Sequence, residues 1–477
     1  MSDPISGEPT MSSDDLATRC AAIAAELPAL AWTTDETQLA RLSQDFSWFS
    51  PVLKRQLEGK RAHIAVRPKT EDELRAVVAA CARQRVPITV RGSGTGNYGQ
   101  IVPLAGGVLV DMGGLNAFGW AKAGAGRAQA GIRLADFDKA AQPLGWELRW
   151  LPSTFRAASL GGLFGGGFGG AGSITYGPIA AAGNVLGARV MSVEPEPQIV
   201  ELRGAEALLV HHKWGTNGIV LELEVALAPA MPWLEMIATF DALPDALDFC
   251  ATLHAATPGI VKKELALMCA PIPEYFTTLA EHLPPGRHAV LMLVAETSEG
   301  ATRDLAAAHR GEVTYRKDAA EVKRLNRTLV EYCWNHTTLQ ALKVDRNLTY
   351  LQARFDPARQ KEQVLALHEK LSPEVMLHLE YIRLTDGRYT CSSLPVVRFT
   401  TEERLAELGG IFEAHGVTIN NAHTHLLEDG GKLRDMDRSA ISAAQRMAAE
   451  AAVAMKQRFD PAGLLNPGKL KSWAGSG

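Results

Sequence analysis

Two glycine-rich segments carry the clearest chemical signal in this sequence. Residues 91–97 read Arg-Gly-Ser-Gly-Thr-Gly-Asn after an apolar run, and residues 153–177 are dense in glycine. Glycine lets a backbone lie against a ligand and adopt positive φ without a steric penalty of about 1–2 kcal/mol per residue. Consecutive N–H groups in such loops form a concave anion site. Together the segments predict a large, flat cofactor that carries phosphate.

The first glycine segment has a plainer explanation when it is taken alone. A glycine turn between two strands would look the same. The segment is not a Walker loop, because it lacks Gly-Lys-Ser/Thr. It is not a Rossmann fingerprint either, because no helix opens directly after the glycines.

A first polar cluster, residues 331–338, has side chains suited to acid–base chemistry. It contains Trp334, Asn335 and His336, and Tyr350 follows it. We expect this cluster where a helix ends. An indole, an amide and an imidazole packed together would suit an aromatic or hydroxy-acid substrate, but a helix C-cap with incidental polar residues is equally compatible.

A second polar cluster, residues 420–429, contains two histidines. In an extended strand His423 and His425 would share one face. They could serve as a base and a hydrogen-bond donor, as metal ligands, or only as structural histidines. Arg383 and Arg398, on strands of the same half, are candidate carboxylate-binding residues because the guanidinium fork matches a carboxylate.

The elements that must position these residues follow from the hydrophobic pattern. Thr70 and Glu73 form a capping box that begins a helix between two strands. Residues 219–227 alternate strictly, which is typical of a half-buried antiparallel strand. After residue 228, two strand–helix–strand units predict an antiparallel sheet backed by helices. There we expect strands near 234–240, 260–268, 289–296, 311–316, 347–354, 376–384 and 389–398, and helices near 244–256, 300–309, 318–333, 357–371 and 437–458.

Composition excludes several classes of function. The chain has 477 residues, a formal net charge of −4 and no block of like charge, so we expect no nucleic-acid partner. Its six cysteines include no CxxC pair, which favours a reducing cytoplasm over a disulfide scaffold or a zinc site. We find neither a signal peptide nor a membrane span. The composition is that of a soluble globular protein of two or three domains.

Ordered sequence blocks make the interpretation specific. The chain resembles flavoproteins of the vanillyl-alcohol oxidase/p-cresol methylhydroxylase superfamily, near the FAD-linked D-lactate and glycolate dehydrogenases. The resemblance covers about residues 60–228 and the C-terminal tail. The matching blocks are Val66–Pro68, Ile88–Gly96, Gly106–Leu115, Ala130–Asp136, Leu160–Gly162, Tyr176–Gly177, Asn184–Gly187, Gly215–Ile219 and Phe459–Lys469.

The resemblance implies FAD and assigns residues to it. The first loop would cradle the pyrophosphate, the second segment would line the flavin and ribityl chain, and later blocks would hold the ribose and adenine side. The implied residues are Arg91, Gly92, Ser93, Gly94, Thr95, Gly96 and Asn97 for the pyrophosphate, Pro152, Ser153, Gly161 and Gly162 for the flavin, and Ser173, Tyr176, Asn184, Gly218, Ile219 and Asn466 for the remainder.

Departures from the family pattern qualify this assignment. Gly172 and Ser173 stand where many relatives have an arginine, and Gly183 replaces an expected aspartate. No histidine lies in residues 91–100, where one branch attaches its flavin. We therefore expect non-covalent FAD, unless a histidine or tyrosine of the second half forms the bond. The metal-binding sequence of the hydroxy-acid branch is absent, so no metal is expected.

The sequence thus predicts an α+β protein with a PCMH-type FAD-binding domain of two subdomains and a ferredoxin-like cap domain. We expect it to dehydrogenate an alcohol or 2-hydroxy acid by hydride transfer to flavin N5, with His423, His425, His336, Tyr350 and Arg383 as catalytic candidates. Alternatives are an oxidase of phenolic or aromatic side chains and a non-catalytic flavin-binding protein. The small-molecule substrate, the electron acceptor (oxygen or a carrier) and a homodimer stay open. The expected domains are 1–58 (helical extension), 59–229 (FAD), 230–428 (cap) and 429–477 (return to the FAD domain).

Overall fold

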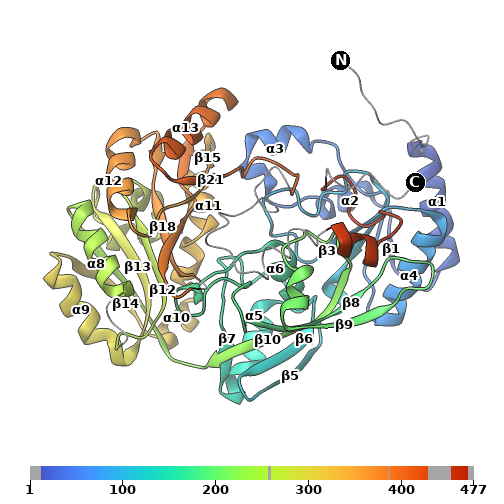
Figure 1. Ribbon diagram of the computed structural model, residues 1–477, viewed down its shortest axis with the longest axis horizontal. Coiled ribbons are helices and arrows are strands. Elements are labelled where there is room, and N and C mark those ends of the chain that lie inside the picture. Colours follow the sequence, from blue (N-terminus) through green and yellow to red (C-terminus); the bar gives the residue numbers. More distant parts are fainter. Residues whose placement is uncertain (1–11, 256–258, 385, 428–452, 471–477) are drawn as a thin grey trace.

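The computed structural model describes residues 12–255, 259–384, 386–427 and 453–470. Figure 1 shows two halves side by side. The first half contains residues 12–229 together with 453–470, and the second half contains residues 230–427. The expected mixed α+β class is confirmed. Within the described part of the chain, no helix is long and apolar enough to cross a membrane.

The first half begins with a small, mostly parallel sheet in the order β1-β2-β4-β3. The capping interaction expected at Thr70 is present, since its side chain accepts the Glu73 N–H at 3.1 Å. The Glu73 carboxylate accepts from Lys69 N at 2.6 Å instead of from Thr70. The elements are α1 (Ser13–Glu26), β1 (Trp32–Thr33), α2 (Glu36–Leu42), α3 (Pro51–Gln56), β2 (Ile64–Val66), α4 (Glu71–Gln84), β3 (Ile88–Arg91) and β4 (Val108–Asp111).

A six-stranded antiparallel sheet completes the first half. Its order is β5-β6-β10-β8-β9, and β7 also pairs with β10. The first part of β10 alternates between buried and half-buried residues, as its sequence predicts. The elements are β5 (Phe118–Lys122), β6 (Ala125–Gln129), α5 (Leu134–Ala141), β7 (Trp146–Leu148), α6 (Leu160–Gly166), α7 (Ser173–Tyr176), β8 (Val185–Met191), β9 (Ile199–Arg203) and β10 (Ile219–Pro229).

The second half is built on an eight-stranded sheet in the order β14-β11-β13-β12-β18-β19-β16-β21. Its first four strands follow the chain order β-α-β-β-α-β, and so do its last four. The two sets join where β12 pairs with β18. The elements are β11 (Trp233–Phe240), α8 (Leu243–Ala255), β12 (Lys262–Met268), β13 (His288–Ala295), α9 (Glu299–Ala308), β14 (Glu312–Lys317), β16 (Gln352–Arg354), α12 (Gln360–Leu371), β18 (His378–Arg383), β19 (Tyr389–Ser393), α13 (Glu402–Ala414) and β21 (Thr418–Asn420).

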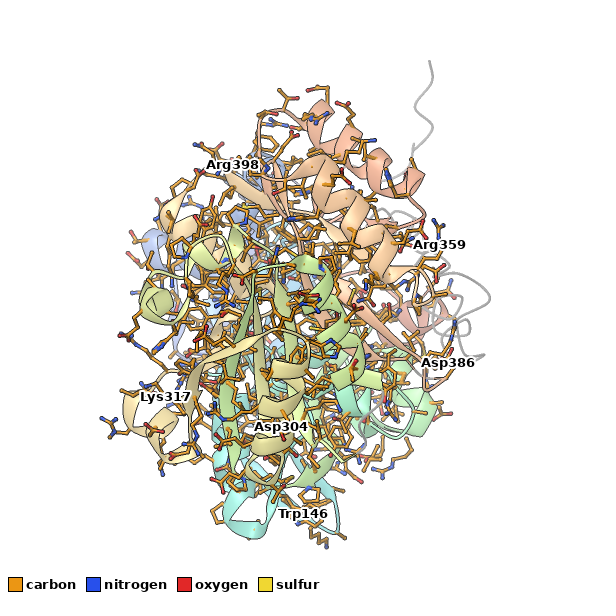
Figure 2. The ribbon with its side chains drawn as sticks, turned by 90° about the vertical axis from the view of Figure 1, so that its left-hand side faces the viewer. Trp146, Asp304, Lys317, Arg359, Asp386 and Arg398 are labelled. Carbon is orange, nitrogen blue, oxygen red and sulfur yellow. The ribbon has the colours of Figure 1, made fainter. Side chains whose placement is uncertain are left out.

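The two faces of this sheet bury different cores. Leu265 and Leu267 of β12 face the core that holds α8 and α12, whereas Ala266 and Met268 face the core that holds α11 (Asn335–Val344). Figure 1 shows α8, α9 and α12 on the side away from the first half. Figure 2 looks onto that helical side. The inner face therefore points toward the first half. Its other elements are α10 (Ala319–Leu325) and the small sheet of β15 (Leu348–Tyr350), β17 (Val375–Met376) and β20 (Val396–Arg398).

A buried ion pair joins the two halves. Lys263 of β12 donates to the Glu147 carboxylate of β7 at 2.6 Å, and both residues are less than 5% exposed. The Trp233 indole N–H donates to the same carboxylate at 3.1 Å. The Gly172 N–H also bonds to the Lys263 carbonyl. These contacts fix the inner face of the second half against the glycine-rich stretch of the first.

Three expectations about local structure need comment. Helix α11 begins at Asn335, so the first polar cluster lies at a helix start and not at a helix end. Strand β21 ends at Asn420, so His423 and His425 do not lie in the expected strand. Most of the helix expected over 437–458 lies outside the described residues. Residues 453–459, which are described, are helical.

Candidate cofactor and substrate site

A cavity of about 280 Å³ lies between the two halves. Three glycine-bearing segments of the first half form one wall, and side chains of the second half form the opposite wall. The first-half wall includes Gly92–Tyr98 with Gln100, Pro152–Thr154, Gly161–Leu163, Gly165–Gly169 and Gly215 with Asn217–Val220, and the second-half wall consists of Trp334, Asn335, His336, Gln352, Ser392 and Leu394.

The first loop lines the cavity with its backbone. Residues Gly92 to Asn97, all expected at a cofactor, lie in the wall. Arg91 does not line it. Its guanidinium turns back and donates to the carbonyls of Leu42 and Gln44 at 2.7 and 2.8 Å. The arginine therefore fixes the base of the loop, and its contact with a pyrophosphate stays a prediction.

The second glycine segment packs tightly against the first. A Cβ on Gly92 would lie 2.3 Å from Ser159 Oγ, and a Cβ on Gly161 would lie 2.6 Å from Ala130 Cβ. Ser159 Oγ itself accepts the Gly162 N–H at 3.2 Å. Only glycine allows this approach, and the result is a wall of bare main chain. Pro152, Ser153, Gly161 and Gly162 all line it, and their contact with a flavin stays a prediction.

The C-terminal tail connects the loops behind the cavity. Gly218, with φ of +99°, and Ile219 lie in the wall. Asn466 does not line the cavity, but its side-chain amide donates to the carbonyls of Gln100 and Trp214 at 2.8 and 2.7 Å. Lys469 donates to the Gly99 carbonyl at 2.6 Å. The tail therefore holds cavity-lining segments that are far apart in sequence.

Three further residues expected at FAD, besides Arg91 and Asn466, lie outside the cavity wall. Ser173 Oγ accepts the Gly170 N–H at 3.1 Å. The Asn184 amide donates to the carbonyls of Tyr176 and Pro178, each at 2.9 Å. Arg149 lies over the Tyr176 ring and donates to Asn184 Oδ1 at 2.9 Å. In this structure Ser173, Tyr176 and Asn184 hold the end of the glycine-rich stretch, and their contact with FAD stays a prediction.

The second-half wall presents polar groups to the cavity from the start of α11. Asn335 Oδ1 is buried and has no hydrogen-bond partner among the residues that the structure describes. Burial, with a smaller contribution from Lys343, lowers the pKa of His336 to about 4. The imidazole is therefore neutral near pH 7 and can accept a proton at one nitrogen. The structure brings His336 into the cavity wall, and its catalytic role stays a prediction.

Tyr350 lies directly behind this wall. Its hydroxyl is fully buried and lacks a well-aligned hydrogen-bond partner within the described part of the chain. It is close enough to the Asn97 and Tyr98 side chains, both of which line the cavity, for these to influence its pKa. Burial raises the pKa of Tyr350 well above its usual value, so the phenol keeps its proton.

The other catalytic candidates do not line the cavity. The His423 ring lies between Ser50 Oγ and the Tyr350 carbonyl, each at 2.8 Å. His425 Nδ1 lies 3.3 Å from Gln56 Oε1. The Arg383 guanidinium bonds to the Tyr389 hydroxyl and lies over its ring. Direct contact of these three residues with a substrate stays a prediction that their positions do not favour.

Sequence reasoning missed several wall residues. His212 lines the cavity at φ of +54°. The Tyr98 and Trp214 rings stack at 5.9 Å. Gln352 and Ser392 reach the wall from β16 and β19. No local signal marks these residues, because only the pairing of strands in the second half brings them to the cavity.

The wall residues fit a dinucleotide cofactor. Glycines 165 and 215 have no atom within 4 Å of where a Cβ would stand, so the main chain there borders open space. Such loops expose N–H groups that suit phosphate oxygens. The buried, unpartnered Asn335 Oδ1 on the opposite wall can accept a hydrogen bond from a bound group. The extended glycine wall would hold FAD, with the polar groups of α11 opposite.

Comparison with known proteins agrees with this geometry. Residues 62–202 match the model of the FAD binding domain family. The glycolate oxidase subunit GlcD of Escherichia coli (strain K12) is 30% identical over 202 residues, which cover 39% of each chain. The uncharacterized FAD-linked oxidoreductase Rv2280 of Mycobacterium tuberculosis (strain ATCC 25618 / H37Rv) is 30% identical over 178 residues, 35% of this chain and 38% of that protein. The match therefore spans about two fifths of the length of these curated relatives.

Solved structures agree over the whole fold. A structure of alkyldihydroxyacetonephosphate synthase superposes with a TM-score of 0.69 and 13% identity, covering 98% of this chain and 86% of that one. A second structure of that enzyme gives a TM-score of 0.67 at 14% identity. At these identities the likeness concerns the fold alone.

The fold and the site define a protein whose two halves enclose a cavity walled on one side by bare main chain. Together with the family match, they place this chain in the superfamily of FAD-linked oxidoreductases with a PCMH-type FAD-binding domain. Its cofactor is FAD.

Proposed function

We propose that this protein is an FAD-dependent enzyme that oxidises a CH–OH group of a small molecule. The observation that carries the proposal is the cavity itself, in which a main-chain wall faces the neutral imidazole of His336 and the unpartnered Asn335 Oδ1. Bound FAD supplies an acceptor for a hydride from carbon. Residues 230–428 would form a cap domain, with two ferredoxin-like units that cover the flavin.

His336 is our candidate for the group that receives the hydroxyl proton. His336 lies in the first turn of α11, and its ring lies near the Glu331 carbonyl, which favours an N–H on the ring. Because a carbonyl only accepts, the nitrogen facing it would carry the hydrogen and the other nitrogen would stay an acceptor. A base within hydrogen-bond reach of the hydroxyl makes hydride release easier as the O–H proton leaves. Asn335 would orient the same hydroxyl.

The chemistry of the cap wall favours an uncharged alcohol. The wall is built from an indole, two amides, an imidazole, a hydroxyl and a leucine. These groups give apolar and hydrogen-bonding contacts but no counter-ion for a carboxylate. A 2-hydroxy acid remains the second candidate, supported by the partial match to a glycolate oxidase subunit. The aromatic lining by Trp334, Phe46 and Phe49 would also accept a benzylic alcohol.

An anaerobic substrate panel tests the proposal. FAD-loaded protein is mixed with aliphatic alcohols, aromatic alcohols, 2-hydroxy acids and phenols, and loss of the visible flavin absorbance is followed. We expect bleaching by an alcohol and a rate reduced at least tenfold in His336→Ala. The control is His309→Asn, at the end of α9 on the outer side. Absence of bleaching by every compound would favour a non-catalytic flavin protein.

The mode of FAD attachment needs a separate test. We propose non-covalent binding, because residues 91–100 hold no histidine. Acid precipitation should then release all of the yellow colour into the supernatant. Colour that stays with the protein pellet in wild type but not in His336→Ala or His212→Ala would identify a covalent bond and contradict this proposal. Recovery of colour in air after reduction would separate an oxidase from a dehydrogenase.

A further inference from the structure

Two carboxyl groups lie buried directly behind the cap wall. Glu264 of β12 is 1% exposed and Glu380 of β18 is 0% exposed. Ala266 pairs with Glu380 across these antiparallel strands, so Glu264 and Glu380 are diagonal neighbours on the face that points to the cavity. Carboxylate oxygens of the two residues and Cys333 Sγ all lie within 4.8 Å of one another.

Both carboxyl groups hold the same residue of the cavity wall. The Trp334 indole N–H donates to Glu264 Oε2 at 3.1 Å, and the Trp334 backbone N–H donates to Glu380 Oε1. Trp334 has φ of +55° and ψ of −140°, a backbone conformation that a bulky residue rarely adopts. It immediately precedes Asn335 and His336. The two carboxyl groups therefore fix Trp334. The position of Trp334 in turn sets the direction of the polar first turn of α11.

The groups that face the pair supply no compensating positive charge. From the preceding turn, the Cys333 thiol donates to the Leu329 carbonyl at 3.3 Å. From β11, the buried Glu235 accepts from Thr328. From β18, His378 Nδ1 lies 3.4 Å from Glu380 Oε1. Across the described ranges, no lysine or arginine forms an ion pair with Glu264 or Glu380.

His378 is neutral, and its Nδ1 can accept a hydrogen bond. Its Nε2 lies 2.7 Å from the Leu394 carbonyl, so Nε2 carries the hydrogen and Nδ1, the nitrogen near Glu380, has a free lone pair. Burial lowers the pKa of His378 to about 4. Two ionised carboxylates in such surroundings would be very unfavourable, whereas a single negative charge with one shared proton satisfies the Trp334 donors.

We propose that Glu264 and Glu380 share one proton and act together as a positioning pair, which holds Trp334 and the start of α11 against the cavity. The pair touches neither the substrate nor the cofactor, and the proposal does not depend on which molecule the protein oxidises. It predicts that the surroundings of Trp334 change when the shared proton is lost, at a pH far above the pKa of an ordinary carboxyl group.

Fluorine NMR of the FAD-loaded protein labelled with 5-fluorotryptophan tests the pair. Trp334→Phe identifies the resonance of Trp334. In wild type we expect this resonance to shift in a single step between neutral and alkaline pH, because burial raises the pKa of both carboxyl groups and the charge of Glu380 raises that of Glu264 further. In Glu264→Gln and Glu380→Gln the repulsion is gone, so the step should move to lower pH or disappear.

The matched control is Glu235→Gln, which removes a neighbouring buried carboxyl group that does not contact Trp334. It should leave the Trp334 step in place. A Trp334 resonance that does not titrate in wild type, or that titrates alike in Glu264→Gln, would overturn the proposal. So would a stoichiometric divalent metal in purified wild type that is lost in Glu264→Gln, since a metal ion would then replace the proton.

Infrared spectroscopy keeps the test decisive if the single variants do not fold. In the Glu235→Gln protein at neutral pH, a carbonyl stretch of a protonated carboxyl group that shifts in D₂O is expected. Its absence would show that no carboxyl group in the protein keeps a proton and would contradict the shared proton directly.

Discussion

Replacing Glu147 by alanine is expected to loosen the second half from the first and to weaken FAD retention. The Lys263 ammonium lies 2.6 Å from the Glu147 carboxylate, and the side chains are 5% and 4% exposed. The same carboxylate accepts from the Trp233 indole and from Met231 N at 3.1 and 3.2 Å. Removing one partner of a buried ion pair typically costs about 3–5 kcal/mol, because the other charge stays buried.

The consequence should extend to the cofactor. Lys263 also accepts the Gly172 N–H through its carbonyl, and Lys262 accepts from the Thr175 hydroxyl at 3.0 Å. A disturbed Lys263 would therefore move the end of the glycine-rich stretch. We expect Glu147→Ala to lower the urea midpoint of unfolding and to lose FAD on dilution or gel filtration more readily than wild type.

A matched surface pair and a double variant separate charge burial from simple loss of contact. Lys361 and Asp248 form an ion pair between helices, with side chains 48% and 46% exposed. Asp248→Ala should cost only about 0–1 kcal/mol. Replacing both buried partners, as in Glu147→Met with Lys263→Met, should recover most of the loss. If Glu147→Ala costs no more than Asp248→Ala, the reasoning is refuted.

Three further variants address the cavity and the buried titratable groups. Gly161→Ala would place a Cβ 2.6 Å from Ala130 Cβ, so we expect at least about tenfold weaker FAD binding in fluorescence titration, whereas Gly300→Ala, with no atom within 4 Å, should have none of this effect. The Glu264–Glu380 pair has raised pKa values when folded, so the free energy of unfolding should fall as pH rises from the ordinary carboxyl pKa through the raised values. In Glu264→Gln, urea titrations should show a weaker dependence of this free energy on pH. Burial lowers the pKa of His423 from 6.5 to about 4. Its neutral form should therefore contribute roughly 3 kcal/mol to the free energy of unfolding, in full above pH 6.5 and progressively less as the pH falls toward 4. In His423→Gln this part of the loss of stability in acid should be absent.

Features that depend on local chemistry could be predicted from the sequence. The glycine loops were identifiable because the need for bare main chain is met by glycine at consecutive positions. The Thr70 cap and the alternation of β10 were predictable for the same reason, since each depends on residues a few positions apart. His336 lies in the cavity wall at a helix start, and its role in a site stays a prediction.

Features that depend on distant partners could not be predicted in this way. The buried position of His423 depends on Ser50, which is 373 residues away. We expect from the sequence that His423 and His425 share one face of a strand, but the strand of the structure ends at Asn420. The Glu264–Glu380 pair exists only because Ala266 is in register with Glu380. Nothing near either glutamate in the sequence marks it as one half of a pair.

The two walls of the cavity depend on different physical requirements, and so they should respond differently to change. The wall of the first half needs space for the main chain, so any added side chain at Gly92 or Gly161 should weaken FAD binding at every pH. The wall of the second half depends on buried ionisable groups behind Trp334, so isosteric Glu→Gln changes there should act mainly through pH. A variant of the first wall with a pH-dependent defect would argue against this division of roles. A loss of FAD binding in Glu380→Gln that does not depend on pH would also argue against this division of roles.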